Sequence, residues 1–258
     1  MERILTAPDC GTATESRTRV FVIGDSTAAS YGTERYPLTG WGQVLSSYFD
    51  DDITVSNRAQ SGASSKSFYY NYWNDVISDI KAGDYVIIQF GHNDGKTTVS
   101  QEDNVPVPDP NRYTDPNGDH TAQGSYKWYL NKYVEATRAK GAFPVIATSI
   151  ERRRVSEGGE FSHSDDLLNY SQSAREFAAL KDVPLIDMNV KTFSMYRRFG
   201  AEGSKKIFLI ADAGVYTAYP DGKTDNTHLS EFGAHEIAGV FASELLKSDI
   251  PLKKHVRR

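Results

Sequence analysis

The chain has 258 residues, 39% of them hydrophobic, so it can bury a sizeable core and suits one large α/β domain. Its formal charge of −5 at pH 7 argues against a nucleic acid or an anionic membrane as partner, because both favour basic patches, and it favours a neutral or weakly charged substrate. The single cysteine, Cys10, excludes an intrachain disulfide. The sequence holds no Cys/His cluster with metal-ligand spacing and no run of 18 apolar residues, so we expect no metal, no cofactor and no membrane span.

Residues 1–18 are polar and lack periodicity, so we expect an irregular segment followed by a single domain over residues 19–250. Met1–Thr6 contains no basic stretch leading into an apolar one, so no signal peptide is predicted; the protein then stays inside the cell, or a leader has been removed. We expect the basic tail at 253–258 to be a solvated end, and the protein to be a monomer.

The first predicted element is a buried strand over residues 19–23, a short run of β-branched and apolar side chains that ends at Gly24. Ser26 follows two residues later, which places its hydroxyl at the carboxyl edge of the sheet, where open α/β sheets bind ligands. Ser26 is therefore either a nucleophile or a helix N-cap. Ala28 occupies the last position of the Gly-x-Ser-x-Gly elbow, which excludes that α/β-hydrolase motif.

The next two predicted strands also end at residues that suit a catalytic site. After a helix over 40–49 comes a strand over 53–55, and the loop behind it contains Gly62, whose bare backbone N–H a substrate oxygen can approach closely. After a helix over 71–82 comes the clearest strand, 85–90, followed by Gly91, His92 and Asn93. Asn93 either caps a turn or donates its side-chain amide into the cleft, and His92 is not the expected general base.

Residues 95–124 carry no apolar pattern and form a long loop, of the kind that is functional or disordered in compact domains. Its acidic cluster lacks the 12-residue calcium-loop pattern. Beyond it the sequence predicts helix 125–140, strand 143–148, helix 166–180, strand 183–187 and helix 189–200. Arg152–Arg154 follow the fourth strand, either as a solvated charge run or with an arginine at the substrate edge. Strands that alternate with helices predict a parallel sheet covered on both faces.

Near the end of the chain, Asp225 precedes His228 by three residues on a predicted loop that feeds a helix starting near Ser230. A carboxylate at that spacing can orient the imidazole and stabilise its charged form. His235 lies within the amphipathic helix, and we interpret it as structural.

These separated pieces supply the parts of serine acyl transfer. In a parallel sheet the three strand ends lie along one edge, so Ser26 can attack a carbonyl while His228 takes its proton and Asp225 holds the ring. The backbone N–H groups of Ser26 and Gly62 and the amide of Asn93 form the predicted oxyanion hole.

Four blocks of this sequence resemble the SGNH (GDSL-type) hydrolases, and all four occur in that family's order. They are Gly24-Asp25-Ser26, Gly62 at the end of 57–62, Gly91-His92-Asn93-Asp94, and Asp225-x-x-His228. Within the family the chain looks most like the rhamnogalacturonan acetylesterases. That resemblance implies a flavodoxin-like, three-layer α/β/α fold with about five parallel strands, and removal of acetyl groups from pectic or related plant polysaccharides without a metal. One departure is Ala63, where many relatives carry arginine.

Other activities stay open at this point. A lipase-like or thioesterase enzyme of the same family needs an apolar groove for the acyl chain, whereas the loops here are polar. An O-acetyltransferase uses the same acyl-enzyme but excludes water. A non-catalytic carbohydrate-binding module on this scaffold would lose the nucleophile or the base, and this chain retains both Ser26 and His228.

Overall fold

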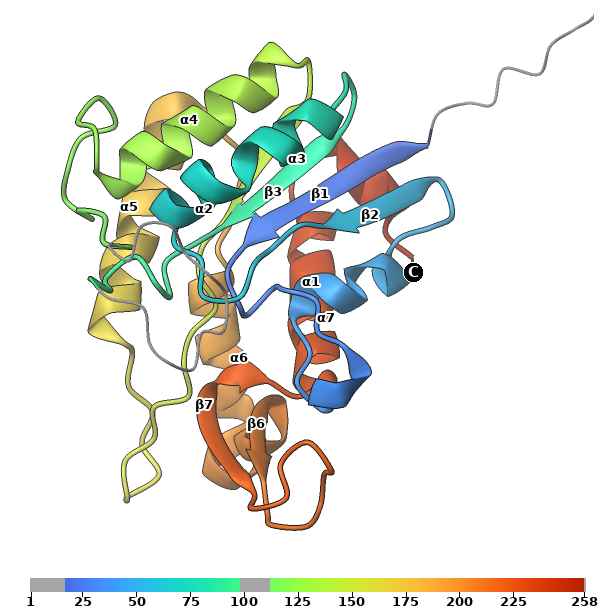
Figure 1. Cartoon of the computed structure of the whole chain (residues 1–258), viewed down its shortest axis with the longest axis vertical. Coiled ribbons are helices and arrows are strands. Elements are labelled where there is room, and N and C mark those ends of the chain that lie inside the picture. Colours follow the sequence, from blue (N-terminus) through green and yellow to red (C-terminus); the bar gives the residue numbers. More distant parts are fainter. Residues whose placement is uncertain (1–16, 98–111, 258) are drawn as a thin grey trace, which may run out of the picture.

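A five-stranded, all-parallel sheet forms the centre of the structure, a computed structural model that describes residues 17–97 and 112–257 (Figure 1). Its strands, in spatial order, are β2 (Ile53–Asn57), β1 (Thr18–Gly24), β3 (Tyr85–Gln89), β4 (Phe143–Ala147) and β5 (Leu185–Ile186). The order 2-1-3-4-5 is that of flavodoxin-like folds, so the predicted fold class and strand number are confirmed. Residues 1–16, most of the expected irregular segment, lie outside the described residues, and the single domain expected over 19–250 stays a prediction.

Helices cover both faces of the sheet, because successive side chains of each strand point to opposite sides. Val20 and Val22 of β1 belong to one apolar core, and Phe21 and Ile23 belong to the other. The first core is closed by α1 (Trp41–Val44), α6 (Met188–Gly203) and α7 (Glu231–Lys247). The second is closed by α2 (Ser65–Asn71), α3 (Trp73–Asp79), α4 (Tyr126–Ala139) and α5 (Asp165–Lys181), so three layers result (Figure 1).

Two predicted helices differ from the observed ones. The helix expected over 40–49 is α1 followed by a 3-10 turn, Leu45–Tyr48. The helix expected over 71–82 is α3, which ends earlier, at Asp79. The helix before it, α2, was not predicted; it begins where the Ser64 side chain accepts the backbone N–H of Ser67 in a capping box, and Tyr72, with φ −132°, separates it from α3.

A two-stranded antiparallel sheet, β6 (Phe208–Ala211) with β7 (Lys223–Leu229), was not predicted. It lies below the carboxyl edge of the main sheet in Figure 1. Asp225 and His228 therefore lie on a strand, and the prediction of a loop at these residues is wrong. The sequence of β7 is almost entirely polar, so it carries no apolar alternation by which the strand could be recognised.

The basic C-terminal segment is packed rather than freely solvated. A 3-10 turn, Pro251–His255, follows α7, and Leu252 and Val256 are buried in the first core. The His255 ring lies 3.1 Å from an Asp50 carboxylate oxygen. Apolar residues interleaved with the basic ones thus fix this end of the chain. Among the helices that the structure describes, none is both long and apolar enough to cross a bilayer.

Candidate active site

Ser26 lies at the point where the strand order reverses, between the carboxyl ends of β1 and β3. The turn depends on Gly24, because a Cβ there would come within 2.6 Å of the Gln89 carbonyl oxygen of β3. Gln89 is fully buried; its side chain accepts the Trp41 indole N–H at 2.8 Å and donates to the Thr27 hydroxyl at 2.9 Å. These contacts fix the chain on both sides of Ser26.

Two further contacts shape the same turn. The buried Asp25 carboxylate accepts both the backbone N–H and the hydroxyl of Thr27, at 2.9 and 2.7 Å. On the other side, the Tyr31 hydroxyl donates to the carbonyl oxygen of Ser26 at 2.7 Å. Burial raises the pKa of Tyr31 to about 12, so the phenol keeps the proton that it donates. Ser26 is thereby held with its side chain free to face the cleft.

The structure brings the three side chains of the predicted triad together across the whole length of the chain. His228 Nε2 lies 2.9 Å from Ser26 Oγ, and His228 Nδ1 lies 2.7 Å from Asp225 Oδ2. A carboxylate only accepts hydrogen bonds, so Nδ1 carries the proton and Nε2 presents its lone pair to the Ser26 hydroxyl. This is the arrangement in which a histidine can act as a general base toward serine.

The Asp225 carboxylate is held in its ionised form. Burial alone would raise the pKa of Asp225, but the hydrogen bond and charge of His228, together with the backbone N–H groups of Thr227 and His228, outweigh it and lower that pKa to about 2. These N–H groups lie 2.8 and 2.9 Å from Asp225 Oδ1, which leaves Oδ2 for the ring. The carboxylate is therefore charged throughout the neutral range.

Arg153 ties β7 to the main sheet. Its backbone N–H donates to the Asn226 carbonyl at 2.9 Å, and its guanidinium donates to the Asn226 side-chain oxygen at 3.0 Å. The same guanidinium reaches the Ala201 carbonyl and the Ser204 hydroxyl, at 2.7 and 3.0 Å. Asn226 lies between Asp225 and His228, so Arg153 helps to place both of them.

Of the three predicted oxyanion donors, Ser26 and Asn93 line the cleft, and the Asn93 side chain bonds the carbonyl of Ala63, the residue after Gly62. The backbone N–H groups of Ser26 and Gly62 make no hydrogen bond to any residue in the described ranges, although both residues are buried. A buried N–H without an acceptor is costly, so two of them beside a serine hydroxyl favour a site for a negatively charged oxygen. Gly62 adopts φ +76°, a conformation that glycine takes without strain.

The orientation of the Asn93 amide follows from its neighbours. Its Nδ2 donates to the Ala63 carbonyl at 2.9 Å, and its Oδ1 accepts the Lys96 ammonium at 2.8 Å. A carbonyl can only accept and an ammonium can only donate, so the reverse orientation of the amide is excluded. One amide hydrogen remains for a ligand in the cleft, which Asn93 lines.

His92 is not placed to act as a base toward Ser26. Its Nε2 lies 3.0 Å from the Ile150 carbonyl and must carry a proton to bond it. Burial, followed by the charges of Arg152 and His228, lowers the pKa of His92 well below its ordinary value, so the ring is neutral. Its role is to join the loop after β3 to the loop after β4.

The cleft has a volume of about 370 Å³, and every side chain that lines it is polar or charged. Three of them are cations: Lys96, Arg152 and Lys223. The side-chain ammonium of Lys223, at the start of β7, makes no hydrogen bond or ion pair with any described residue. The cleft is thus locally basic in a protein of net charge −5. A basic cleft favours an anionic substrate, whereas the overall charge favours a neutral or weakly charged one.

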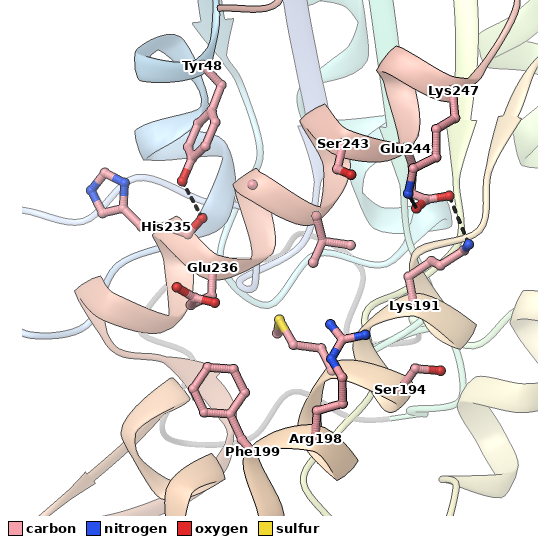
Figure 2. A pocket seen from close by; sticks show the side chains of 13 residues that line it. Tyr48, Lys191, Ser194, Arg198, Phe199, His235, Glu236, Ser243, Glu244 and Lys247 are labelled. Carbon is pink, nitrogen blue, oxygen red and sulfur yellow. Dashed lines mark hydrogen bonds and ion pairs between the residues drawn. The ribbon is translucent and has the colours of Figure 1, made fainter. Parts of the chain in front are cut away.

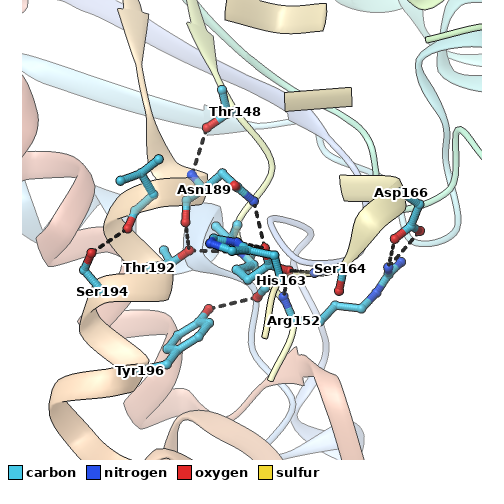
Figure 3. Close-up of polar contacts among 12 residues, drawn as sticks. Thr148, Arg152, His163, Ser164, Asp166, Asn189, Thr192, Ser194 and Tyr196 are labelled. Atoms are coloured by element: carbon cyan, nitrogen blue, oxygen red, sulfur yellow. Dashed lines mark hydrogen bonds and ion pairs between the residues drawn. The ribbon is translucent and has the colours of Figure 1, made fainter. Parts of the chain in front are cut away.

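A buried carboxylate, that of Glu151, anchors Arg152, whose guanidinium pairs with Asp166 in Figure 3. Glu151 accepts the backbone N–H groups of Arg152 and Ser164, at 2.9 and 3.2 Å. It also meets His163 Nδ1 at 2.9 Å and the Asn189 amide at 3.3 Å. The Arg152 guanidinium then reaches the His92 carbonyl at 3.2 Å and Asp166 at 2.9 Å. Of the two interpretations of the arginine run, Arg152 at the substrate edge fits this geometry.

A larger cavity, of about 540 Å³, lies between α6 and α7 and is separate from this cleft (Figure 2). Tyr48, Arg198 and His235 line it, and none of the predicted catalytic side chains does. His235 contributes its backbone carbonyl, which accepts the Tyr48 hydroxyl at 2.6 Å. Three of its charged side chains pair with one another, since Glu244 bonds both Lys191 and Lys247. Cavity size alone would therefore point to the wrong place.

Sequence reasoning missed several side chains that shape the site. Tyr31 and Lys223 lie in segments where neither periodicity nor a motif singles them out, and Arg153 was noticed only as one member of the run Arg152–Arg154, without its contact to Asn226. A tyrosine after the Ser26 turn and an arginine after a strand are weak signals, because both residues are common on surfaces. Only their contacts in three dimensions identify them.

The GDSL-like Lipase/Acylhydrolase family model matches residues 22–235. The chain is 36% identical over 239 residues to the rhamnogalacturonan acetylesterase RhgT of Bacillus subtilis (strain 168), covering 92% of this chain and 94% of that protein. It is 28% identical over 253 residues to a rhamnogalacturonan acetylesterase of Emericella nidulans, covering 93% of this chain and 89% of that protein.

Two solved structures share the fold. The structure of YxiM from Bacillus subtilis aligns with TM-score 0.70 at 23% identity, over 92% of this chain but only 58% of that chain. The acetylxylan esterase Axe2 from Geobacillus stearothermophilus aligns with TM-score 0.59 at 16% identity, over 89% of this chain and 94% of that chain. The family match and the identity to RhgT confirm the predicted family: the protein belongs to the GDSL-like (SGNH) lipase/acylhydrolases and is a carboxylic ester hydrolase.

Proposed function

We propose that the protein is a serine carbohydrate esterase that removes O-acetyl groups from a pectic polysaccharide of the rhamnogalacturonan type. The observation that carries the chemistry is the hydrogen-bonded series Ser26 Oγ–His228 Nε2–Asp225, with distances of 2.9 and 2.7 Å. The backbone N–H groups of Ser26 and Gly62, which bond no acceptor among the described residues, supply oxyanion donors. No bound metal is required for this reaction, because the serine is activated by a general base and the oxyanion is stabilised by hydrogen bonds.

Acylation begins when Ser26 Oγ attacks the acetyl carbonyl carbon and His228 Nε2 takes the hydroxyl proton. The carbonyl oxygen becomes an oxyanion that accepts hydrogen bonds from Ser26 N, Gly62 N and Asn93 Nδ2. The C–O bond to the sugar then breaks, and His228 returns its proton to the leaving alkoxide. Asp225 stabilises the imidazolium in between and does not itself take the proton.

Deacylation repeats these steps with water. His228 removes a proton from a water molecule, whose oxygen attacks the acetyl-Ser26 carbonyl. Collapse of the second tetrahedral intermediate releases acetate and restores the Ser26 hydroxyl with the proton from His228. Asp225, ionised at neutral pH, keeps the ring in the tautomer that both half-reactions need.

The proposal of a pectic substrate rests on the relatives and on the cleft. RhgT and the protein from Emericella nidulans are named rhamnogalacturonan acetylesterases. A pectic chain carries uronate carboxylates, and Lys96, Arg152 and Lys223 line the cleft. The polar lining also argues against a lipase, since a long acyl chain needs apolar walls.

The deciding experiment measures acetate release from acetylated rhamnogalacturonan, acetylated xylan and acetylated glucomannan, with no acceptor other than water. We expect the rhamnogalacturonan to be deacetylated fastest, and Ser26→Ala to lower kcat by about 10⁶-fold while leaving the circular dichroism spectrum unchanged. Faster release from xylan would overturn the pectic substrate. Loss of acetyl groups from the polymer only when a sugar acceptor is added, with the acetyl group recovered on that acceptor and not as acetate, would indicate an acetyltransferase.

A second experiment tests whether the cleft cations select an anionic chain. Lys223→Gln should raise KM for acetylated pectin with free carboxylates and leave KM for the fully methyl-esterified polymer unchanged, because only the former carries the charge. Lys247→Gln, in the α6–α7 cavity, is the matched control and should change neither KM. An equal effect of Lys223→Gln on both polymers would exclude recognition of the carboxylate.

A further inference from the structure

A fully buried guanidinium contacts the backbone of the proposed oxyanion hole. Arg112 has no exposed surface, and its Nη1 donates to the carbonyl oxygen of Gly62 at 2.7 Å. Burying a cation is costly unless hydrogen bonds compensate it, so this contact is a specific one. Arg112 comes from the long loop before α4, fifty residues further along the chain than Gly62.

Gly62 is a residue whose backbone needs such a contact. It is the third residue of a turn closed by the Ala63 N–H on the Gln60 carbonyl at 3.2 Å, and its φ of +76° is the value that a type II turn requires there. Glycine is the residue with the greatest backbone freedom, so the turn alone fixes the direction of the Gly62 N–H only loosely. A hydrogen bond from an immobile donor to the carbonyl of the same residue removes that freedom.

The donor is immobile because its segment is bonded to the strand end that carries Asn93. The Thr114 backbone N–H donates to the Asp94 carbonyl at 2.8 Å, and the Thr114 hydroxyl reaches the Asp94 carboxylate at 3.0 Å. Asp94 in turn accepts the Ser65 backbone N–H at 3.1 Å, just after the Gly62 turn. The Tyr170 hydroxyl also donates to the Thr114 carbonyl at 2.7 Å.

Two consecutive carbonyls of the Gly62 turn are therefore held by side chains from two other segments. Arg112 holds the Gly62 carbonyl, and Asn93 holds the Ala63 carbonyl at 2.9 Å. The proposed oxyanion donors, Gly62 N and Asn93 Nδ2, thus belong to one hydrogen-bonded unit. Catalysis of this kind depends on donors that are aligned before charge develops, because reorienting them during the reaction is costly.

We infer that Arg112 is a positioning residue of the oxyanion hole: it holds the Gly62 carbonyl and so limits rotation about the Gly62 backbone, which keeps the N–H of the same residue directed at the developing oxyanion. This rests on the proposed function, since it presumes that Gly62 N is an oxyanion donor. Arg112 is not among the residues that line the cleft, so its proposed effect is transmitted by Gly62. Its effect falls on the transition state, where the oxyanion exists, and spares substrate binding.

The test compares Arg112→Ala and Arg112→Lys with the wild type on 4-nitrophenyl acetate. We expect Arg112→Ala to lower kcat by about 10- to 100-fold, less than the loss of a donor itself, with KM within about threefold. Arg112→Lys, which keeps a cationic donor, should recover part of kcat. Arg19→Ala, which removes a part-buried arginine paired with Asp84 at the other edge of the sheet, is the matched control and should leave kcat unchanged.

The affinity for phenylboronic acid distinguishes a positioning role of Arg112 from a purely structural one, because a purely structural role would leave this affinity unchanged. Boron forms a tetrahedral adduct on Ser26 with an oxygen in the oxyanion hole, so affinity should fall by the same factor as kcat/KM in Arg112→Ala. The inference is overturned if kcat of the folded variant stays within about twofold of wild type, or if it falls while boronate affinity is unchanged.

Asn93→Ala separates this inference from the proposed function. We expect it to lower kcat by about 10²- to 10³-fold. If Asn93→Ala has no effect, the proposed oxyanion hole itself is wrong, whatever Arg112 does. If Asn93→Ala is slow and Arg112→Ala is not, the oxyanion hole stands and only the role of Arg112 fails.

Discussion

Two histidine–carboxylate pairs in this protein have nearly the same local geometry and different surroundings. In one, His228 Nδ1 lies 2.7 Å from Asp225; in the other, His163 Nδ1 lies 2.9 Å from Glu151. The two imidazoles are equally exposed, at 32% and 31% of the side chain. Carboxylate and ring alone therefore do not distinguish a catalytic pair from a structural one.

The second ring nitrogen makes the difference. His228 Nε2 faces the hydroxyl of Ser26, whereas the His163 ring stacks on Phe193 with centroids 3.7 Å apart. The Glu151 carboxylate is fully buried and also bonds backbone N–H groups, so it serves as a structural hub (Figure 3). Of the two pairs, the Asp225–His228 pair thus has a hydroxyl beside it, as the proposed mechanism requires.

Replacing each carboxylate by the corresponding amide tests the difference between the two pairs, and the larger effect on activity is expected at Asp225. Asp225→Asn should lower kcat by about 10⁴-fold, because the amide no longer enforces the Nδ1–H tautomer or stabilises the imidazolium. The measurement is kcat on 4-nitrophenyl acetate and on the acetylated polymer. A loss of less than about tenfold would mean that Asp225 does not orient the base.

The difference between the two histidine–carboxylate pairs also explains which features of the fold and the site the sequence could predict. The Asp225–His228 spacing and the three strand ends are local patterns, and parallel strands bring such ends to one edge, so the sequence could predict the fold and could name the residues that the proposed mechanism uses. The Glu151–His163 pair has no such spacing. The strand that carries His228 is polar, and Tyr31, Arg112 and Arg153 act only through contacts formed between distant segments. Those features depend on tertiary packing and leave no periodic signal.

Glu151→Gln is the matched change in the second pair, and its expected effect is on stability. A glutamine keeps one acceptor for the N–H groups of Arg152 and Ser164, but its amide group faces the Asn189 amide, which is also a donor. We expect the free energy of unfolding to fall by about 1–3 kcal/mol, the cost of leaving buried polar groups unsatisfied.

Activity should respond quite differently to this variant. On 4-nitrophenyl acetate, which has no carboxylate for Arg152 to meet, kcat should stay within about threefold of wild type. Urea denaturation and steady-state kinetics on the same preparation measure both quantities. A large loss of kcat without a loss of stability would show that the two pairs are functionally coupled, and that the Glu151–His163 pair is not purely structural.

The smallest effect concerns acid stability and again separates the catalytic pair from the rest of the protein. The pKa of Asp225 is lowered to about 2 in the folded chain, below its value of about 3.9 in an unfolded one. Its stabilising contribution is therefore complete above about pH 4 and is lost as the pH falls toward 2, a change of about 2 kcal/mol. The difference in unfolding free energy between wild type and Asp225→Asn should shrink by that amount between about pH 5 and 2.5, since every other carboxylate is common to both proteins. A difference that stays constant across this range would mean that His228 does not stabilise the ionised Asp225 carboxylate in solution. The pair would then behave like any exposed aspartate beside a histidine.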